Sequence, residues 1–194
     1  MRAMRNLVTV WLGFVFLFAG STLAQVDEST LAQVQRERAP LIDTMRELVS
    51  IESGSRDFDG LSRIAEVIAG RLRMLGGDVD LVEPTDIYHM QDTPEQIGRS
   101  VVARFRGTGT RRILLLAHMD TVYLKGMLAE QPFRLEGNRA YGLGIADDKH
   151  GIALILHTLS VLKAIGFNDY GLITVLINAD EEVSSAGSRS RMKR

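Results

Sequence analysis

Ile113-Leu114-Leu115-Leu116-Ala117-His118-Met119-Asp120 is the stretch of sequence that decides the fold. Its consecutive apolar residues predict a strand, from Arg112 to Ala117, that is apolar on both faces and therefore belongs inside a sheet. The run becomes polar at His118 and Asp120, so a histidine and a carboxylate follow the strand directly. Because α/β sheets carry their sites just beyond the carboxyl ends of strands, this end is a candidate functional site.

Helices and strands alternate on either side of this stretch. Apolar residues recur at near-helical spacing from Glu28 to about Ile51, where Pro40 favours either two short helices or one kinked helix. Gly76-Gly77 ends a second predicted helix, and a third is apolar around most of its girth. These two helices span Leu61 to Leu75 and Lys149 to Ile165.

Three further strands and one hairpin complete the pattern. The strands are expected at Val79 to Val82, Ser100 to Phe105 and Leu172 to Ile177, and the hairpin turns at Glu136-Gly137-Asn138. Helices that alternate with buried strands indicate an α/β fold, with a mixed, largely parallel sheet flanked by helices.

The composition excludes several classes of protein. The chain has 194 residues, of which 45% are hydrophobic and 24% charged, which suits one globular domain. Its formal net charge is -1 and its basic residues are scattered, so we expect no nucleic-acid partner. It contains no cysteine, so no disulfide holds the fold and any metal must be bound by His, Asp or Glu.

The N-terminus has the layout of a signal peptide. Arg2 and Arg5 precede the apolar run Leu7 to Ala19, and small residues lead to Ala24. We therefore expect residues 1–24 to be removed before Gln25, and the mature part, residues 25–194, to be periplasmic or secreted without a stable membrane anchor. A retained anchor is the alternative, although the run is shorter than the roughly 20 residues that cross a bilayer.

Three polar clusters follow predicted strands or precede a predicted helix: His118 with Asp120, Asp147-Asp148, and Asp180-Glu181-Glu182. Carboxylates that converge on one sheet edge destabilise a fold unless a cation neutralises them. Imidazole and carboxylate ligands suit zinc and also admit cobalt or manganese. Taken alone, His118 with Asp120 is better explained by ordinary solvated loop residues or helix caps than by a metal site, and Asp147 or Asp148 could simply cap the following helix. The combination of the three clusters is what favours a metal site.

The other three histidines carry no such expectation. We interpret His157 as a packed, hydrogen-bonded residue of the apolar helix and His89 as solvated. His150 is expected to be exposed, with a metal contact as the alternative because Asp147 is close in sequence.

Three motifs together resemble the metal site of a known metallopeptidase family. They are Leu114-Leu115-Leu116-Ala117-His118-Met119-Asp120-Thr121-Val122, Gly142-Leu143-Gly144-Ile145-Ala146-Asp147-Asp148-Lys149 and Ile177-Asn178-Ala179-Asp180-Glu181-Glu182. The family includes glutamate carboxypeptidase, aminoacylase and succinyl-diaminopimelate desuccinylase, and the chain looks most like the bacterial glutamate carboxypeptidases. The likeness continues to Gly187-Ser188-Arg189.

The resemblance implies roles for five residues and a two-zinc site. His118 resembles a ligand of one zinc, Glu182 a ligand of the second and Asp147 the carboxylate that bridges both. Glu181 resembles the general base, and Asp120 resembles the carboxylate that orients His118. The implied activity is hydrolysis of an amide or peptide bond in a small peptide or acyl-amino acid, with release of a C-terminal glutamate or a similar residue.

The resemblance also implies parts that this sequence lacks. In the family another acidic ligand, a distant histidine ligand and a smaller domain for dimerisation and substrate binding follow, and full-length relatives are expected to be homodimers. The chain is accordingly expected to be an inactive N-terminal part of the catalytic domain.

Other functions stay open from the sequence. They are an aminopeptidase or deacylase of the same fold, a non-catalytic fragment that binds a metal or a partner, and a nucleotide-binding protein suggested by Gly142-Leu143-Gly144.

Overall fold

The computed structural model describes residues 27–190, and the predicted signal peptide lies outside them. In chain order the principal elements are α1 (Glu28–Val49), α2 (Phe58–Met74), β1 (Asp78–Val82), β2 (Ser100–Arg106), β3 (Arg112–His118), β4 (Arg134–Glu136), β5 (Arg139–Tyr141), α3 (His150–Ala164) and β6 (Leu172–Asn178). Short helical turns span Met127–Ala129, Ile145–Lys149 and Glu181–Val183. Among the described residues, no helix is long and apolar enough to cross a membrane.

The three predicted helices are confirmed, and the structure decides between the two alternatives for the first of them. Pro40 lies inside α1, which continues as a single helix rather than two short ones. Asp57 caps α2 by accepting a hydrogen bond from the Gly60 amide at 3.2 Å. The other end of α2 stops at Met74, and Gly76 follows in the left-handed region with φ of 100°, a conformation that glycine adopts without steric cost.

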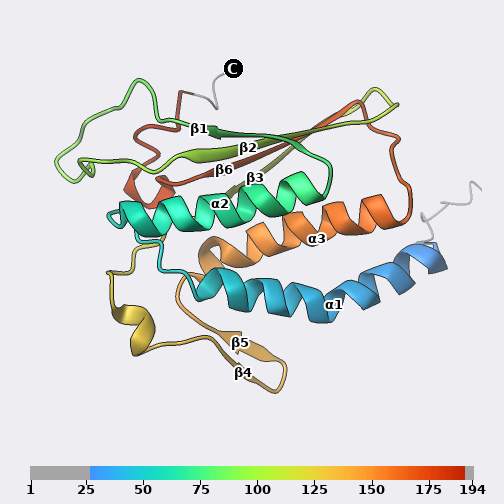
Figure 1. The fold of residues 1–194 in the computed structure, drawn as a ribbon, viewed down its shortest axis with the longest axis horizontal. Coiled ribbons are helices and arrows are strands. Elements are labelled where there is room, and N and C mark those ends of the chain that lie inside the picture. Colours follow the sequence, from blue (N-terminus) through green and yellow to red (C-terminus); the bar gives the residue numbers. More distant parts are fainter. Residues whose placement is uncertain (1–26, 191–194) are drawn as a thin grey trace, which may run out of the picture.

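The main sheet has four strands in the order β1-β2-β6-β3. The predicted mixed sheet is confirmed, although among these strands only β3 and β6 are parallel, while β2 pairs antiparallel with both β1 and β6. The helices α1, α2 and α3 lie on one side of this sheet (Figure 1), with α1 packed on α3. The predicted hairpin is also confirmed and forms the separate pair β4 and β5.

The position of β3 corrects the sequence interpretation. Its apolar run was expected inside the sheet, yet β3 is an edge strand of the described sheet. Ile113, Leu114 and Leu116 are 41%, 59% and 51% exposed, respectively. Apolar residues on both faces indicate that a strand can be covered on both sides, but they do not determine where it stands in the strand order.

The core lies between the sheet and the helices. Val101 and Ala103 of β2, Val175 and Ile177 of β6, and Ile152 of α3 are buried there. The carboxyl ends of the parallel strands β3 and β6 lie side by side, since His118 is the register partner of Asn178. The first and third polar clusters of the sequence therefore leave the sheet at the same edge.

Candidate metal centre

His118, Asp147 and Glu182 come together at this edge of the sheet. His118 is the last residue of β3, Glu182 lies in the turn that follows β6, and Asp147 lies in the turn that precedes α3. His118 Nε2 is 2.8 Å from Asp147 Oδ1, and one potential ligand atom from each of the three residues lies within 4.8 Å of the others. The three predicted metal ligands thus form one cluster that could hold a metal ion.

Asp120 connects two of the loops that carry these ligands. It is fully buried, and its Oδ1 lies 3.3 Å from His118 Nδ1. Its two carboxylate oxygens also accept hydrogen bonds from the backbone amides of Glu181 and Glu182, each at 3.0 Å. Asp120 therefore faces the far nitrogen of His118, as the family resemblance implied, and also holds the glutamate turn, which the sequence did not indicate.

The loop between α1 and α2 contributes hydrogen bonds that hold Asp120 and its neighbour Met119. Ser55 donates its hydroxyl to Asp120 Oδ2 at 2.8 Å, and Ser53 donates its hydroxyl to the Met119 carbonyl at 2.7 Å. The loop can approach so closely because Gly54 has no side chain: a Cβ there would lie 2.2 Å from the carbonyl oxygen of Tyr123. Sequence reasoning missed this support, since two serines in a turn carry no spacing signal for it.

Lys149 anchors the loop that carries Asp147. Although it is a lysine, it is 2% exposed, and its Nζ donates a hydrogen bond to the Ile51 carbonyl at 2.7 Å. Burial lowers the pKa of Lys149 to about 8, and the nearby charge of Glu52 opposes that change. The side chain thereby ties the start of α3 to the end of α1.

The electrostatics of the cluster fit a cation. Burial by itself would lower the pKa of His118, but hydrogen bonds to Asp120 and Asp147 outweigh it and raise the pKa to about 9. Burial and the charge of Asp147 raise the pKa of Glu182. A divalent ion would relieve this crowding of carboxylates, and the imidazole and carboxylate donors suit zinc, cobalt or manganese.

The remaining acidic residues of the motifs point elsewhere. Asp180 Oδ2 accepts hydrogen bonds from the amides of Gly187 and Ser188, so Asp180 shapes its own loop. Asp148 Oδ1 lies 3.6 Å from His150 Nδ1. Neither Asp147 nor Asp148 caps α3, whose N-cap, Lys149, has no side-chain hydrogen bond in that role.

Three further predictions can be compared with the structure. His157 is confirmed as a packed, hydrogen-bonded residue, 2.8 Å from Thr44 Oγ1 and 2.5 Å from Glu37 Oε2. His89 and His150 are exposed, as predicted. Gly142-Leu143-Gly144 follows β5 of the small hairpin instead of a strand of the main sheet, which removes the strand-turn-helix context of a dinucleotide site.

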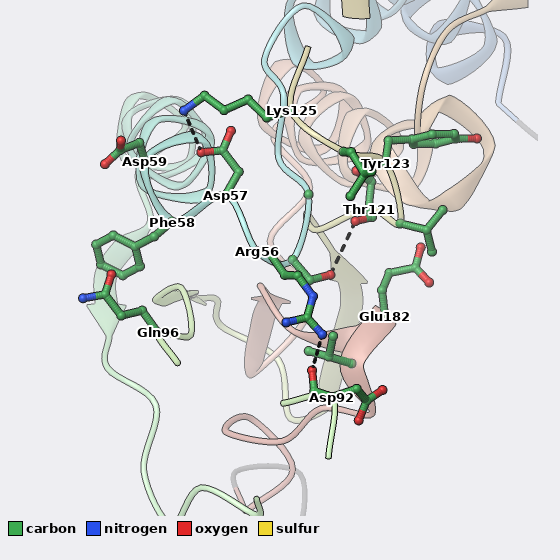
Figure 2. A pocket seen from close by; sticks show the side chains of 15 residues that line it. Arg56, Asp57, Phe58, Asp59, Asp92, Gln96, Thr121, Tyr123, Lys125 and Glu182 are labelled. Carbon is green, nitrogen blue, oxygen red and sulfur yellow. Dashed lines mark hydrogen bonds and ion pairs between the residues drawn. The ribbon is translucent and has the colours of Figure 1, made fainter. Parts of the chain in front are cut away.

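A pocket of about 680 Å³ adjoins the metal cluster. Glu182 lines it together with Arg56 of the loop before α2, Phe58 at the start of α2, and Val122 and Lys125 of the segment after β3. Figure 2 shows this wall, with Lys125 paired to Asp57 and Arg56 extended to Asp92. Cationic and apolar side chains thus stand next to the proposed metal ligands.

Sequence comparison shows which known proteins this chain resembles. Residues 114–193 match the model of peptidase family M20/M25/M40, and this segment contains His118, Asp147 and Glu182. The chain is a relative of this peptidase family. The sequence resemblance to metallopeptidases and the α/β fold prediction are therefore confirmed.

Individual relatives agree. Carboxypeptidase G2 of Pseudomonas sp. (strain RS-16) is 45% identical over 172 residues, which make up 88% of this chain and 40% of the relative. Acetylornithine deacetylase of Photorhabdus laumondii is 30% identical over 161 residues, 77% of this chain and 38% of the relative. The crystal structure of human carnosine dipeptidase 1 shares the fold, with a TM-score of 0.71 and 21% identity over 85% of this chain and 37% of that one. The chain thus spans about two fifths of the length of these proteins.

Proposed function

We propose that this protein takes part in metal-dependent hydrolysis of an amide or peptide bond, releasing a C-terminal glutamate or a similar amino acid. The observation that carries the proposal is the cluster of His118, Asp147 and Glu182 beside a pocket. The 45% identity to carboxypeptidase G2 supports this choice among reactions of the family. The substrate would be a small peptide or an acyl-amino acid.

In this proposal each residue has a distinct role. His118, Asp147 and Glu182 would hold the metal, preferably zinc, which when bound polarises a carbonyl and lowers the pKa of water. Glu181 is exposed, and its charge acts on the pKa of both His118 and Glu182, so its carboxylate lies near the cluster. We assign to Glu181 the proton transfer of a general base. Asp120 would keep the Nδ1 proton on His118, which leaves Nε2 free to bind metal.

The number of ligands limits what the described residues do alone. Zinc sites use about four ligands, of which catalytic sites take three from the protein, so two ions that share one carboxylate need more side chains than this cluster has. We therefore expect residues 25–194 to hold zinc weakly and to hydrolyse substrates slowly or not at all. Two firmly held zinc ions per chain after dialysis, together with ordinary turnover, would contradict this expectation.

A matched pair of glutamate variants tests the assigned roles. Bound zinc is measured in the chain itself, and turnover of an acyl-glutamate in the chain extended by the part of carboxypeptidase G2 beyond the aligned segment. Glu182→Gln should lose zinc, because an amide is a poorer ligand than a carboxylate. Glu181→Gln should keep zinc and lose turnover by roughly 10²- to 10⁴-fold, because the amide accepts no proton. Normal turnover by Glu181→Gln would show that the base lies elsewhere.

A deacylase is the second candidate. The identity of 30% to acetylornithine deacetylase favours it, because the same cluster could serve removal of a small acyl group. Assaying the extended chain on acetyl-amino acids beside dipeptides and acyl-glutamates distinguishes the two reactions. Zinc binding without hydrolysis of any of these substrates would identify a non-catalytic metal-binding module.

A further inference from the structure

Arg56 has an unusual position in the pocket beside the metal cluster. It precedes α2, is exposed, and donates from its Nη2 to the backbone carbonyl of Asp92 at 2.6 Å (Figure 2). Among the described residues no carboxylate lies within ion-pair distance of its guanidinium, whereas Lys125 of the same pocket is paired with Asp57 at 3.4 Å. The contact with Asp92 restrains the side chain and leaves further N–H donors of the guanidinium unused.

Hydrogen bonds connect the backbone next to Arg56 to the loops that carry the metal cluster. Its neighbour Ser55 donates to Asp120 Oδ2, and the same oxygen accepts the Glu182 amide at 3.0 Å. Ser55 also donates its amide to the Thr121 carbonyl at 3.1 Å. The guanidinium therefore projects from a supported loop into the space that Glu182 also lines, and such preorganisation lowers the cost of binding a ligand.

Of the two cationic side chains that line the pocket in the described part of the chain, Lys125 is paired with a carboxylate and Arg56 is not. Asp57 is engaged by Lys125 and by the Gly60 amide, and Glu182 belongs to the metal cluster. Asp59 and Asp92 are exposed to solvent, where water screens their charges. Apolar side chains of Phe58, Val122 and Leu124 line the same space, so the pocket offers a guanidinium beside an apolar wall.

We propose that Arg56 is a specificity-determining residue that binds a carboxylate of the substrate in the pocket lined by Glu182. This inference rests on the proposed function and adds to it the recognition of an acidic substrate. A planar guanidinium binds a carboxylate through charge-assisted hydrogen bonds with defined geometry, which a lysine does not reproduce. The apolar wall suits an acyl or aromatic group on the same molecule.

The test compares two probes that differ only in charge. Binding of N-benzoylglutamate and of its neutral diamide to the full chain is followed by ligand-observed NMR in buffer with excess zinc. The chain should bind the dicarboxylate more tightly than the diamide. Arg56→Gln should lower the affinity for the dicarboxylate by about 10- to 100-fold, the range of a charged hydrogen bond, and should leave the affinity for the diamide unchanged. Arg56→Lys should recover only part of the preference. Arg63→Gln is the matched control, since Arg63 is exposed on α2 and does not line this pocket.

The outcomes distinguish failure of the role assigned to Arg56 from failure of the proposed reaction. Equal affinity of wild type and Arg56→Gln for the dicarboxylate, or no binding of it by wild type, overturns the role of Arg56. If Arg56→Gln binds neither probe, that variant has lost its structure and Arg56→Lys decides instead. Normal binding of the diamide by Arg56→Lys with weakened binding of the dicarboxylate supports the role of Arg56, and wild-type binding of both probes overturns it. Absence of hydrolysis in the extended chain, with the charge preference intact, overturns the proposed reaction but leaves the assignment of Arg56 standing.

Discussion

Asp120 illustrates how much a single buried carboxylate organises in this protein. Its side chain is 0% exposed and contacts His118, Ser55 and the amides of Glu181 and Glu182. Groups that orient a metal ligand typically contribute 10- to 100-fold to metal affinity. Here the same carboxylate also positions the turn that carries the two glutamates, so its effect should reach more than one ligand.

Replacing Asp120 by Asn should therefore weaken zinc binding by roughly 10- to 100-fold. The amide nitrogen has no lone pair for the Glu181 or Glu182 amide, so one of these N–H groups loses its acceptor and the turn loosens. Competition with a chromophoric chelator measures the affinity. Asp78→Asn, on the exposed start of β1, is the control and should leave zinc binding unchanged. An unaltered affinity in Asp120→Asn would mean that the ligands hold their positions without it.

The protonation of His118 predicts how zinc binding responds to pH. In the metal-free chain its pKa is about 9, above the usual 6.5, so the ring is protonated at neutral pH and zinc must displace a proton. Apparent affinity should rise as pH increases, by up to about tenfold per pH unit below the pKa. Calorimetry at about pH 7 in two buffers of different ionisation enthalpy should detect about one released proton. Affinity that is flat from about pH 6 to 8 would contradict this account.

The site residues differ in how far the sequence could predict them. Position along the chain predicts that the polar clusters containing His118, Asp147 and Glu182 meet, because each cluster follows a strand or precedes a helix. The choice of these three residues within the clusters came from the resemblance to the metallopeptidase family. The contacts of Asp120 with two backbone amides could not be predicted, since they depend on β3 and β6 being neighbours in parallel register. Arg56 gave no signal at all, because a turn between two helices has no periodicity that places it beside a strand end.

At the level of elements, a polar network connects the helices. His157 of α3 contacts Glu37 and Thr44, both of α1, and Thr44 accepts a hydrogen bond from Arg71 of α2 at 3.1 Å. Ser160 adds a hydrogen bond to Glu37 at 3.0 Å. Because Thr44 is 1% exposed, losing a partner leaves a polar group away from water, which costs more than the hydrogen bond contributes net.

His157→Ala should lower the free energy of unfolding by about 2–3 kcal/mol, since Glu37 and Thr44 both lose a partner. Urea denaturation followed by circular dichroism measures the change. His89→Ala removes the same side chain from an exposed loop and should alter stability by less than about 0.5 kcal/mol. Equal effects of the two substitutions would show that the network adds nothing to the packing of α1 on α3.

For the molecule as a whole, the fold was predictable in its elements but not in their order. The strand and helix positions follow from apolar periodicity, which is local. Strand order is a long-range property, so the sequence placed Leu114 and Leu116 of β3 inside a sheet whereas they lie exposed on its edge strand. Val102, Thr174 and Leu176 line a second pocket of about 500 Å³ together with Leu114.

This exposed apolar strand predicts self-association of residues 25–194. An edge strand offers unpaired backbone groups, and apolar side chains on it make pairing with another chain favourable. The double substitution Leu114→Lys with Leu116→Lys should suppress association, because two charges would have to be buried at the contact. It should change the free energy of unfolding by less than about 1 kcal/mol, since both side chains are already about half exposed or more. Sedimentation velocity over a concentration series measures the effect. Leu154→Lys, which replaces a leucine 49% exposed on α3, is the control and should leave association as it was. Association that persists in the β3 variant, or disappears in the α3 variant, would place the contact elsewhere on the molecule.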